Sequence, residues 1–393
     1  MPTERGARGA GVALAAALSL TCATSLQAAD IRVSMGAGGP QAMYRSGVDG
    51  CAPIDTPDID PRAFRDASGG VAMFALHYVN RALRGPDLAH LKIDCAVALD
   101  SAHDPEAAHY NDRRYMTATW TDNGRDVVGI VHHEYHADDH RACATTQSIG
   151  CWYNTILSFS SRDGGRSFTM DRPAVVAAAP FKQDVEQGRH RGFFNPSNIV
   201  SDGRYKYFMA STTGWSGQNY GVCLFRSPNP FDSASWRAWD GADFTVRYGD
   251  PYGPRAPAPR PCAIVAPFVF PVGSLVKHAA SGRWLAVWMA KKDDGAFPIS
   301  GFYTSTSGDL RHWSQPRLLL AGPTIHDGAC GGSLIAYPSI IDENARTRNF
   351  EDAGDSPWLY YVSIKMNGCE TGERTLQRER LKISLDERAG VHP

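Results

Sequence analysis

Short apolar runs separated by polar turns recur along the chain from residue 50 onward. Five segments share one pattern, in which an apolar run leads through a polar turn into a second apolar run; they begin at residues 61, 115, 196, 273 and 338. Runs of this length, bounded by Gly, Asp and Ser, are typical of β-strands joined by turns. Long amphipathic helical runs are scarce, so the pattern predicts an all-β protein.

The repetition of this hairpin is the strongest indication of the fold. Three of the segments begin alike, with P-S-N-I-V at 196–200, V-G-S-L-V at 272–276 and P-S-I-I at 338–341. Self-similarity at this length is typical of propellers, so five copies predict a five-bladed β-propeller. The blades would cover roughly 50–100, 110–175, 190–245, 265–320 and 335–385 of a single domain spanning 30–393. A β-sandwich is the alternative, but it would not need the same hairpin five times.

The two ends of the domain are expected to meet. Apolar runs at 31–35 and 381–385 are strand candidates. Pairing between them would close the ring and remove exposed sheet edges.

A tight turn is predicted at Ser161–Phe168, which reads S-x-D-x-G-x-x-F. Glycine allows the positive φ of such a turn, and short polar side chains bond the local backbone. The stretch resembles the Asp-box of sialidases and related β-propellers. A shorter form at 305–313 resembles the S-x-D-L-x-x-W turn of five-bladed glycosidases, and a longer one lies at 227–236. The resemblance implies a propeller fold, and the motif itself says little about chemistry.

Composition narrows the class of protein. The net charge is −1, without the basic excess of a nucleic-acid-binding surface. Residues 1–29 resemble a secretory signal, with Arg5 and Arg8 before an apolar core and Ala28-Ala29 as a cleavage site. No second hydrophobic run long enough to span a membrane follows. We therefore expect a secreted or periplasmic monomer, with lipidation at Cys22 as the alternative.

The cysteines favour disulfide bonds. Of 9 cysteines, eight remain after the signal, and an even number in an exported chain is typical of a disulfide framework. The expected pairs are Cys51–Cys95, Cys143–Cys151, Cys223–Cys262 and Cys330–Cys369. No C-x-x-C pair is present, so a zinc knuckle is not expected. We predict no metal site and no cofactor, and leave a structural Ca²⁺ in the channel open.

One mouth of the propeller should carry the chemistry. The first strand of each blade lines the channel, so the starts of first strands and the ends of second strands share one mouth. Turn residues such as Asp66, Asp122 and Asp202 would lie at the other mouth and be structural. Aromatic rings stack on sugars, and amides and charged groups bind hydroxyls. The substrate-binding candidates are Arg62, Arg114, Tyr115, Asn195, Asn198, Trp215, Lys291 and Tyr337.

The densest candidate cluster is His132–His140. On a strand, His132, Glu134 and His136 point one way and His133 and Tyr135 the other. A carboxylate flanked by imidazoles can act as a general acid or base, which makes Glu134, His136 and His133 catalytic candidates. Metal ligation and a merely solvated strand end are the alternatives.

Asp60, just before the first inner strand, is the second carboxylate that we select. Five-bladed glycosidases such as arabinanases, xylosidases and invertases place an acidic residue there, then an acid in the second blade and a Glu in the third. Here the third blade opens on Asn195. Sialidases instead use an arginine triad, for which Arg62, Arg81, Arg114 and Arg191 are available. A structural Asp-Pro turn is the alternative role of Asp60.

The sequence therefore predicts a secreted glycoside hydrolase acting on an oligo- or polysaccharide, with Glu134 and Asp60 as its acid/base pair. One alternative is a carbohydrate-binding propeller without activity. The other is a polysaccharide lyase that uses His133, Tyr135 and Arg114.

Overall fold

The computed structural model describes residues 30–143, 148–179, 190–215, 217–254, 258, 260–293 and 296–386. The expected signal at 1–29 and Cys22 lie outside these residues. Within them the chain forms strands and four short 3₁₀ helices, and contains no α-helix. The all-β prediction is confirmed.

The first two units are four-stranded antiparallel sheets whose strands pair in chain order. The first unit consists of β3 (Arg62–Arg65), β4 (Val71–Phe74), β5 (Asn80–Gly85) and β6 (Lys92–Leu99). The second consists of β7 (Arg113–Trp120), β8 (Val127–His136), β9 (Trp152–Ser161) and β10 (Thr169–Ala178). The 3₁₀ helices η1 (Ala107–His109) and η2 (Ser148–Cys151) lie in the connections before β7 and β9.

The third unit is joined to the second. It contains β11 (Arg191–Phe194), β12 (Val200–Ser201), β13 (Lys206–Thr212), β14 (Gly221–Ser227), η3 (Ser233–Ser235), β15 (Arg237–Trp239) and β16 (Phe244–Val246). A short parallel pairing of β11 with β9 links the two units into one ten-stranded sheet. The fourth unit contains β17 (Val272–His278), β18 (Trp284–Ala290), β19 (Gly301–Ser307) and β20 (Arg317–Ala321).

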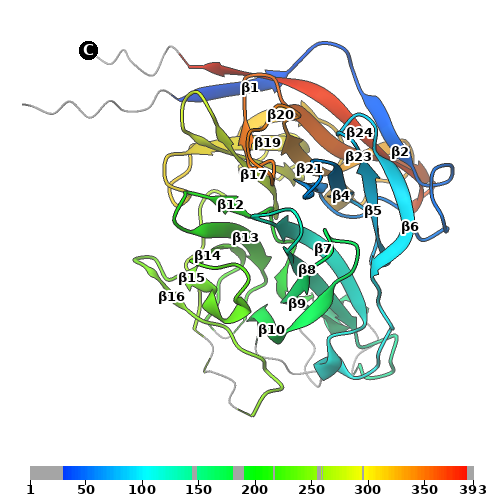
Figure 1. The fold of residues 1–393 in the computed structure, drawn as a ribbon, viewed down its shortest axis with the longest axis vertical. Coiled ribbons are helices and arrows are strands. Elements are labelled where there is room, and N and C mark those ends of the chain that lie inside the picture. The colour runs from blue at the N-terminus through cyan, green and yellow to red at the C-terminus, as the bar shows by residue number, and fades with distance from the viewer. Residues whose placement is uncertain are drawn as a thin grey trace, which may run out of the picture.

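The fifth unit combines both ends of the chain. After η4 (Ile325–Asp327), it contains β21 (Ser333–Ile341), β23 (Trp358–Asn367) and the long β24 (Glu370–Leu385), while β22 (Asp352–Ala353) pairs with β17. The N-terminal strands β1 (Ile31–Met35) and β2 (Gln41–Arg45) both pair with β24, as the blue and red ribbons of Figure 1 show. Ile31 faces Leu385 and Met35 faces Leu381, so the predicted pairing of the two ends is confirmed.

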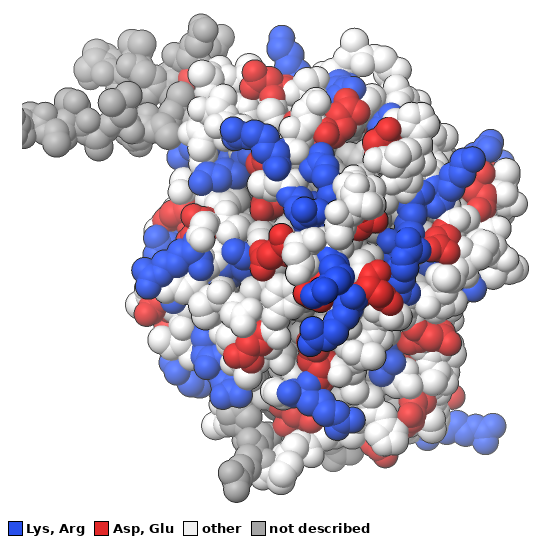
Figure 2. Space-filling view, viewed as in Figure 1, with Lys and Arg blue, Asp and Glu red and all other residues white. Residues whose placement is uncertain are grey.

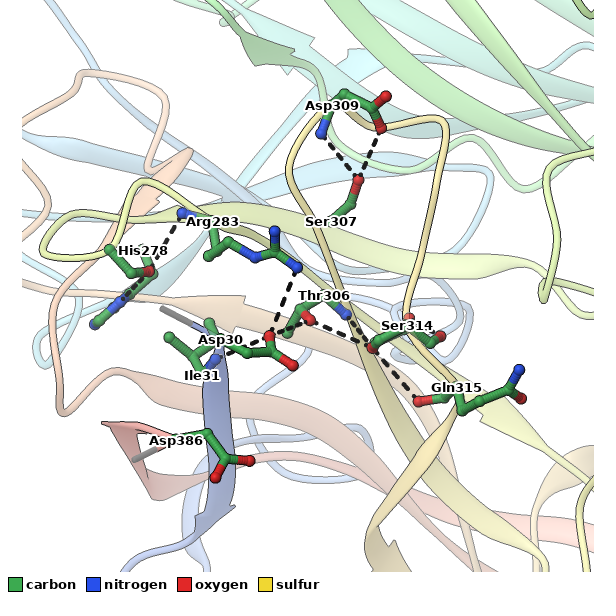
Figure 3. A network of polar contacts seen from close by, with 12 residues as sticks. Asp30, Ile31, His278, Arg283, Thr306, Ser307, Asp309, Ser314, Gln315 and Asp386 are labelled. Atoms are coloured by element: carbon green, nitrogen blue, oxygen red, sulfur yellow. Dashed lines mark hydrogen bonds and ion pairs between the residues drawn. The ribbon is translucent and has the colours of Figure 1, made fainter. Parts of the chain in front are cut away.

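Asp30 fastens this closure to the neighbouring sheet. Its carboxylate accepts a hydrogen bond from Thr306 Oγ1 at 2.6 Å and lies 3.7 Å from the guanidinium of Arg283 (Figure 3). Its carbonyl accepts a hydrogen bond from the backbone N–H of Asp386 at 2.7 Å. The residue preceding β1 thus ties the fifth unit to the fourth.

The inner strands of all five units meet at a common axis. A small internal cavity of about 10 Å³ is lined there by one or more residues of each unit, among them Pro61, Thr119, Asn198, Ser274 and Ser339. Arg62 donates from Nε to Thr117 O at 2.5 Å, from Nη1 to Ser339 Oγ at 2.9 Å and from Nη2 to Pro196 O at 3.1 Å. One buried guanidinium therefore joins four units, and the architecture is that of a β-propeller.

The Ser161–Phe168 stretch forms the expected tight turn. Ser161 Oγ donates to Asp163 Oδ1 at 2.6 Å and accepts from Gly165 N–H at 3.0 Å. Burial raises the pKa of Asp163, but hydrogen bonds, first of all from Ser161 and Ser167, outweigh burial and lower it to about 2. Phe168 is buried, with its ring centroid 5.9 Å from that of Phe74 in the first unit. The turn therefore also seals the seam between two units.

All four predicted disulfide bonds are present: Cys51–Cys95, Cys143–Cys151, Cys223–Cys262 and Cys330–Cys369.

Basic and acidic side chains are interspersed over the face shown in Figure 2, in keeping with the near-zero net charge. Among the described residues no helix has both the length and the apolar character needed to cross a bilayer.

Candidate active site

A cavity of about 400 Å³ lies at the predicted mouth, where first strands begin and second strands end. Four of the predicted site residues line it: Tyr115, Glu134, Asn195 and Tyr337. The other lining residues are Asp58, Ile59, His132, Trp152, Asn154, His190, Phe194, Tyr220, Phe270, Pro271, Met289, Ile325 and His326. This lining of carboxylates, imidazoles, amides and aromatic rings comes from all five units and the segments that connect them.

Two lining residues have strained backbones. Asn195 has φ 47° and Tyr337 has φ 57°, and each precedes a proline. Positive φ is uncommon for residues other than glycine, and a following proline normally favours an extended conformation. Strain of this kind persists where the surroundings enforce it and is concentrated at functional sites. In these two units the turn into the inner strand directs the side chain into the cavity.

Glu134 on β8 lies between two histidines. Its Oε2 is 3.2 Å from His136 Nε2, and its Oε1 is 3.9 Å from His132 Nε2. The expected strand geometry of 132, 134 and 136 is thus observed. Burial lowers the pKa of His132, so this ring is neutral near pH 7 although Glu134 partly counteracts the effect.

Asp58 is held by three partners. Its carboxylate is 3.1 Å from His77 Nε2, accepts from Tyr337 OH at 2.9 Å and forms an ion pair with Arg374. Burial acts to raise the pKa of Asp58, but the hydrogen bond with His77 and the charge of Arg374 outweigh it, and the pKa is lowered. Asp58 is therefore ionised at neutral pH. Arg374 was not predicted as a site residue, because it lies on β24, far along the chain from Asp58.

Asp60 lies two residues further on, between the cavity and the axis. Its Oδ2 is 3.7 Å from Nη2 of Arg62, the residue that joins four units at the central axis (the hub). Its negative charge also contributes to raising the pKa of Tyr337 in the cavity lining. Burial raises the pKa of Asp60 to about 6, and the guanidinium of Arg62 offsets only part of this effect. A Cβ at Gly273 would lie 2.2 Å from Pro338 O and 2.8 Å from Asp60 Oδ1, so glycine is required for the fourth unit to approach the fifth beside this carboxylate.

Tyr115 connects the two acidic segments electrostatically. Burial, followed by the charges of Glu134 and Asp58, raises the pKa of its hydroxyl well above the ordinary value. Asp58 and Glu134, from the first and second units, therefore act on one buried ring. The two acidic segments lie at the same mouth of the propeller.

Three predicted residues lie away from the cavity. His133 points to the opposite face of β8, where its Nε2 accepts a hydrogen bond from Asp112 N–H at 3.2 Å. Arg114 donates from Nε to Tyr110 O at 2.7 Å on that same side. Arg62 donates its hydrogen bonds to other units at the central axis, as described above.

Three further predicted residues also lie outside the lining. Asn198 clamps the backbone of Leu275, donating to its O at 2.8 Å and accepting from its N–H at 2.7 Å. Trp215 is buried and donates from Nε1 to Thr212 Oγ1 at 3.3 Å, as a loop anchor. Lys291 is exposed just beyond β18.

Several lining residues were not predicted, and one signal could have found Phe270 among them. Like the predicted Asp60, Asn195 and Tyr337, Phe270 precedes the proline that opens an inner strand. Three of these four positions line the cavity, and Asp60 lies beside it. Asn154 and His190 carry no such signal. Among the described residues no group of three or more His, Cys, Asp or Glu side chains is arranged to hold a metal ion.

The sequence matches no model of a protein family and no curated protein. Among solved structures, it is similar to an endo-arabinase from Bacteroides thetaiotaomicron, with a TM-score of 0.47 and 9% identity over 88% of this chain and 99% of that one. It is also similar to an α-L-arabinofuranosidase from Podospora anserina, with a TM-score of 0.46 and 12% identity over 86% and 95%. An N-acetylgalactosamine deacetylase from F. plautii has a TM-score of 0.46 and 11% identity over 92% and 100%.

Proposed function

We propose that the protein is an exported glycoside hydrolase that cleaves an oligo- or polysaccharide in this cavity, with Glu134 and Asp60 as the acid/base pair. The observation that carries the proposal is the presence of two acidic segments from different units at one aromatic-lined mouth. Glycoside hydrolysis requires two carboxyl groups that flank one bond. The four disulfide bonds support export.

The lining suits a sugar. A volume of about 400 Å³ is within the range of small-molecule sites. The rings of Trp152, Phe194 and Phe270 offer apolar faces, and the Asn195 amide offers hydrogen bonds to hydroxyls. We infer that the cavity holds one ring of the substrate beside the carboxylates.

The carboxylates are suited to different tasks. Asp60, with a pKa of about 6, retains part of its proton near neutral pH and can protonate the leaving oxygen. Glu134 then acts as base or nucleophile on the other side of the bond. Asp58, kept ionised by His77 and Arg374, stabilises the positive charge that develops on the sugar ring.

The lyase alternative loses support. Two of its three side chains, His133 and Arg114, bond to the chain on the far side of β8. The other alternative is a carbohydrate-binding propeller without activity. An assay for cleavage of bound glycans separates it from a hydrolase.

Replacing Glu134 by Gln tests the proposal. On a panel of oligo- and polysaccharides, release of reducing ends by Glu134→Gln and by Asp60→Asn should each fall by roughly 10² to 10⁴ relative to the wild type. Glu343→Gln, at an exposed ion pair with Arg380, is the matched control and should keep full activity.

Three results would contradict the proposal. Undiminished hydrolysis by Glu134→Gln would remove Glu134 from the chemistry. Products with an unsaturated sugar would identify a lyase. Binding of a glycan by the wild type without any cleavage would identify a carbohydrate-binding propeller.

A further inference from the structure

Four polar side chains form a continuous row along one wall of the cavity: Glu134, His132, Asn154 and His190. Glu134 and His132 lie on β8, Asn154 lies on β9, and His190 precedes β11. His132 Nε2 is 2.8 Å from Asn154 Oδ1, and Asn154 Nδ2 is 2.9 Å from His190 Nδ1. The row thus extends from the proposed reactive carboxylate across the junction between the second and third units.

The orientation of the Asn154 amide is fixed by a third contact. Asn154 Nδ2 donates to the backbone carbonyl oxygen of Arg191 at 3.2 Å, and a carbonyl can only accept. The NH₂ group must therefore face Arg191, which turns Oδ1 toward His132. An amide oxygen only accepts, so the proton of His132 is on Nε2 and is donated to Asn154. By the same argument, Nδ1 of His190 accepts and carries no proton.

The Arg191 carbonyl is held in place by the parallel pairing of β11 with β9. Arg191 pairs with Tyr153, and Gly192 pairs with Asn154. Gly192 has φ 108°, and a Cβ there would lie 2.0 Å from Asn154 O. Only glycine lets the two strands approach this closely, so the orientation of the amide is built into the backbone.

The consequence concerns the two oxygens of Glu134. Oε2 has a hydrogen-bond partner in His136, whereas Oε1 lies 3.9 Å from an N–H that is already committed to Asn154. We propose that Asn154 is a positioning residue that directs the His132 proton away from Glu134 and so leaves Oε1 as the reacting oxygen. This inference rests on the proposed function, because it assigns the atom that reacts.

Loss of the amide has a specific consequence. Without Asn154 Oδ1, the N–H on His132 Nε2 can turn to Glu134 Oε1, 3.9 Å away, with Asn195 as the other polar neighbour of the ring. A hydrogen bond donated to a carboxylate stabilises its charged form and makes it a weaker base. The variant should therefore bind substrate normally and react slowly.

Asn154→Leu tests this, since Leu has a similar size and no polar atoms. We expect kcat on the best substrate of the panel to fall about tenfold, because the base is weakened and only part of the acid/base contribution is lost. KM should change less than about twofold, since substrate binding is unaffected. Adding His132→Phe to Asn154→Leu removes the interfering donor and should restore kcat at least partly. Asn349→Leu is the matched control: its buried amide clamps Thr121 N–H and O at 2.8 and 3.0 Å, so stability should fall while kcat does not.

A second measurement does not depend on activity. In protein labelled with ¹⁵N-histidine, NMR should show His132 and His190 in the wild type neutral and protonated at Nε2. Protonation of either ring at Nδ1 would overturn the assignment. So would a wild-type kcat in folded Asn154→Leu, or no recovery in the double variant. Failure of the wild type to cleave any glycan would instead refute the proposed function, while the NMR signals would still decide the tautomers.

Discussion

At the scale of single residues, Asp58 and Asp60 show how burial and partners give two similar groups opposite properties. Both are largely buried, and a single residue, Ile59, separates them along the chain. Asp58 has His77, Tyr337 and Arg374 as partners, so its pKa is lowered. Asp60 has Arg62 at 3.7 Å, which is too weak to offset burial, and its pKa rises to about 6. Neighbouring carboxyl groups with separated pKa values are typical of acid/base sites.

We predict that Asp60→Asn stabilises the protein at neutral pH while lowering its activity by the factor given above. A pKa raised from 3.8 to about 6 means that the folded state binds more protons between these values, so stability falls as pH rises through that window. Above pH 6 the ionised Asp60 costs the fold up to about 3 kcal/mol, which Asn avoids.

Thermal unfolding of Asp60→Asn and of the wild type at pH 4 and pH 7.5 checks this. The difference in melting temperature should be small at pH 4 and favour the variant at pH 7.5. A variant that is less stable than the wild type at pH 7.5 would mean that the Asp60–Arg62 ion pair stabilises the hub.

At the scale of elements, the starts of the inner strands decide what enters the cavity. The repeat of apolar hairpins predicted the inner strands, the mouth and four of its residues, because that pattern reflects burial along each strand. The even number of cysteines after the signal, and their proximity along the chain, predicted the four disulfide bonds, since each closes a local loop. Arg62 and Asn198, predicted as substrate contacts, lie outside the cavity lining, because polarity at a strand start does not distinguish the central axis from the mouth. Asn154 and His190 could not be predicted, since their contact depends on two strands from different units.

The parallel pairing of β9 with β11 gives an element-scale prediction. Gly192 and Gly203 both have positive φ, 108° and 99°, but only Gly192 has backbone atoms where a Cβ would lie. Gly203→Ala should therefore cost about 1 kcal/mol for its backbone conformation. Gly192→Ala should cost several times more, because the strands must separate.

Denaturant unfolding of the two variants measures both costs. The inference also predicts that Gly192→Ala shifts the ring-nitrogen NMR signals of His132 and His190, while Gly203→Ala leaves them unchanged. Equal free energies of unfolding for the two variants would show that β9 and β11 tolerate a wider spacing.

At the scale of the whole molecule, the fifth unit depends on residues from both ends of the chain. β1 pairs with β24 from Ile31 to Met35, and Asp30 links this pair to Thr306 and Arg283 of the fourth unit (Figure 3). Arg62 performs a corresponding task at the axis. Neither link could be inferred from local sequence, because the partners lie 134 to 277 positions away along the chain.

Removing residues 30–36 should open the ring. The deletion exposes one edge of β24, so we expect a lower melting temperature, faster proteolysis of 370–385 and a tendency to aggregate. A chain that begins at residue 30 is the control and should behave as the full chain does after removal of 1–29. Unchanged proteolysis of the shortened protein would mean that β2 alone secures β24.

The order of synthesis gives this closure a further consequence. β1 leaves the ribosome first and β24 last, so the first strand waits without its partner until almost the entire protein has been made. A premature stop within 370–385 would remove that partner although most residues of the cavity are already present. The ring cannot close before β24 has been synthesised. This topology is therefore compatible with export that begins while the chain is still being made.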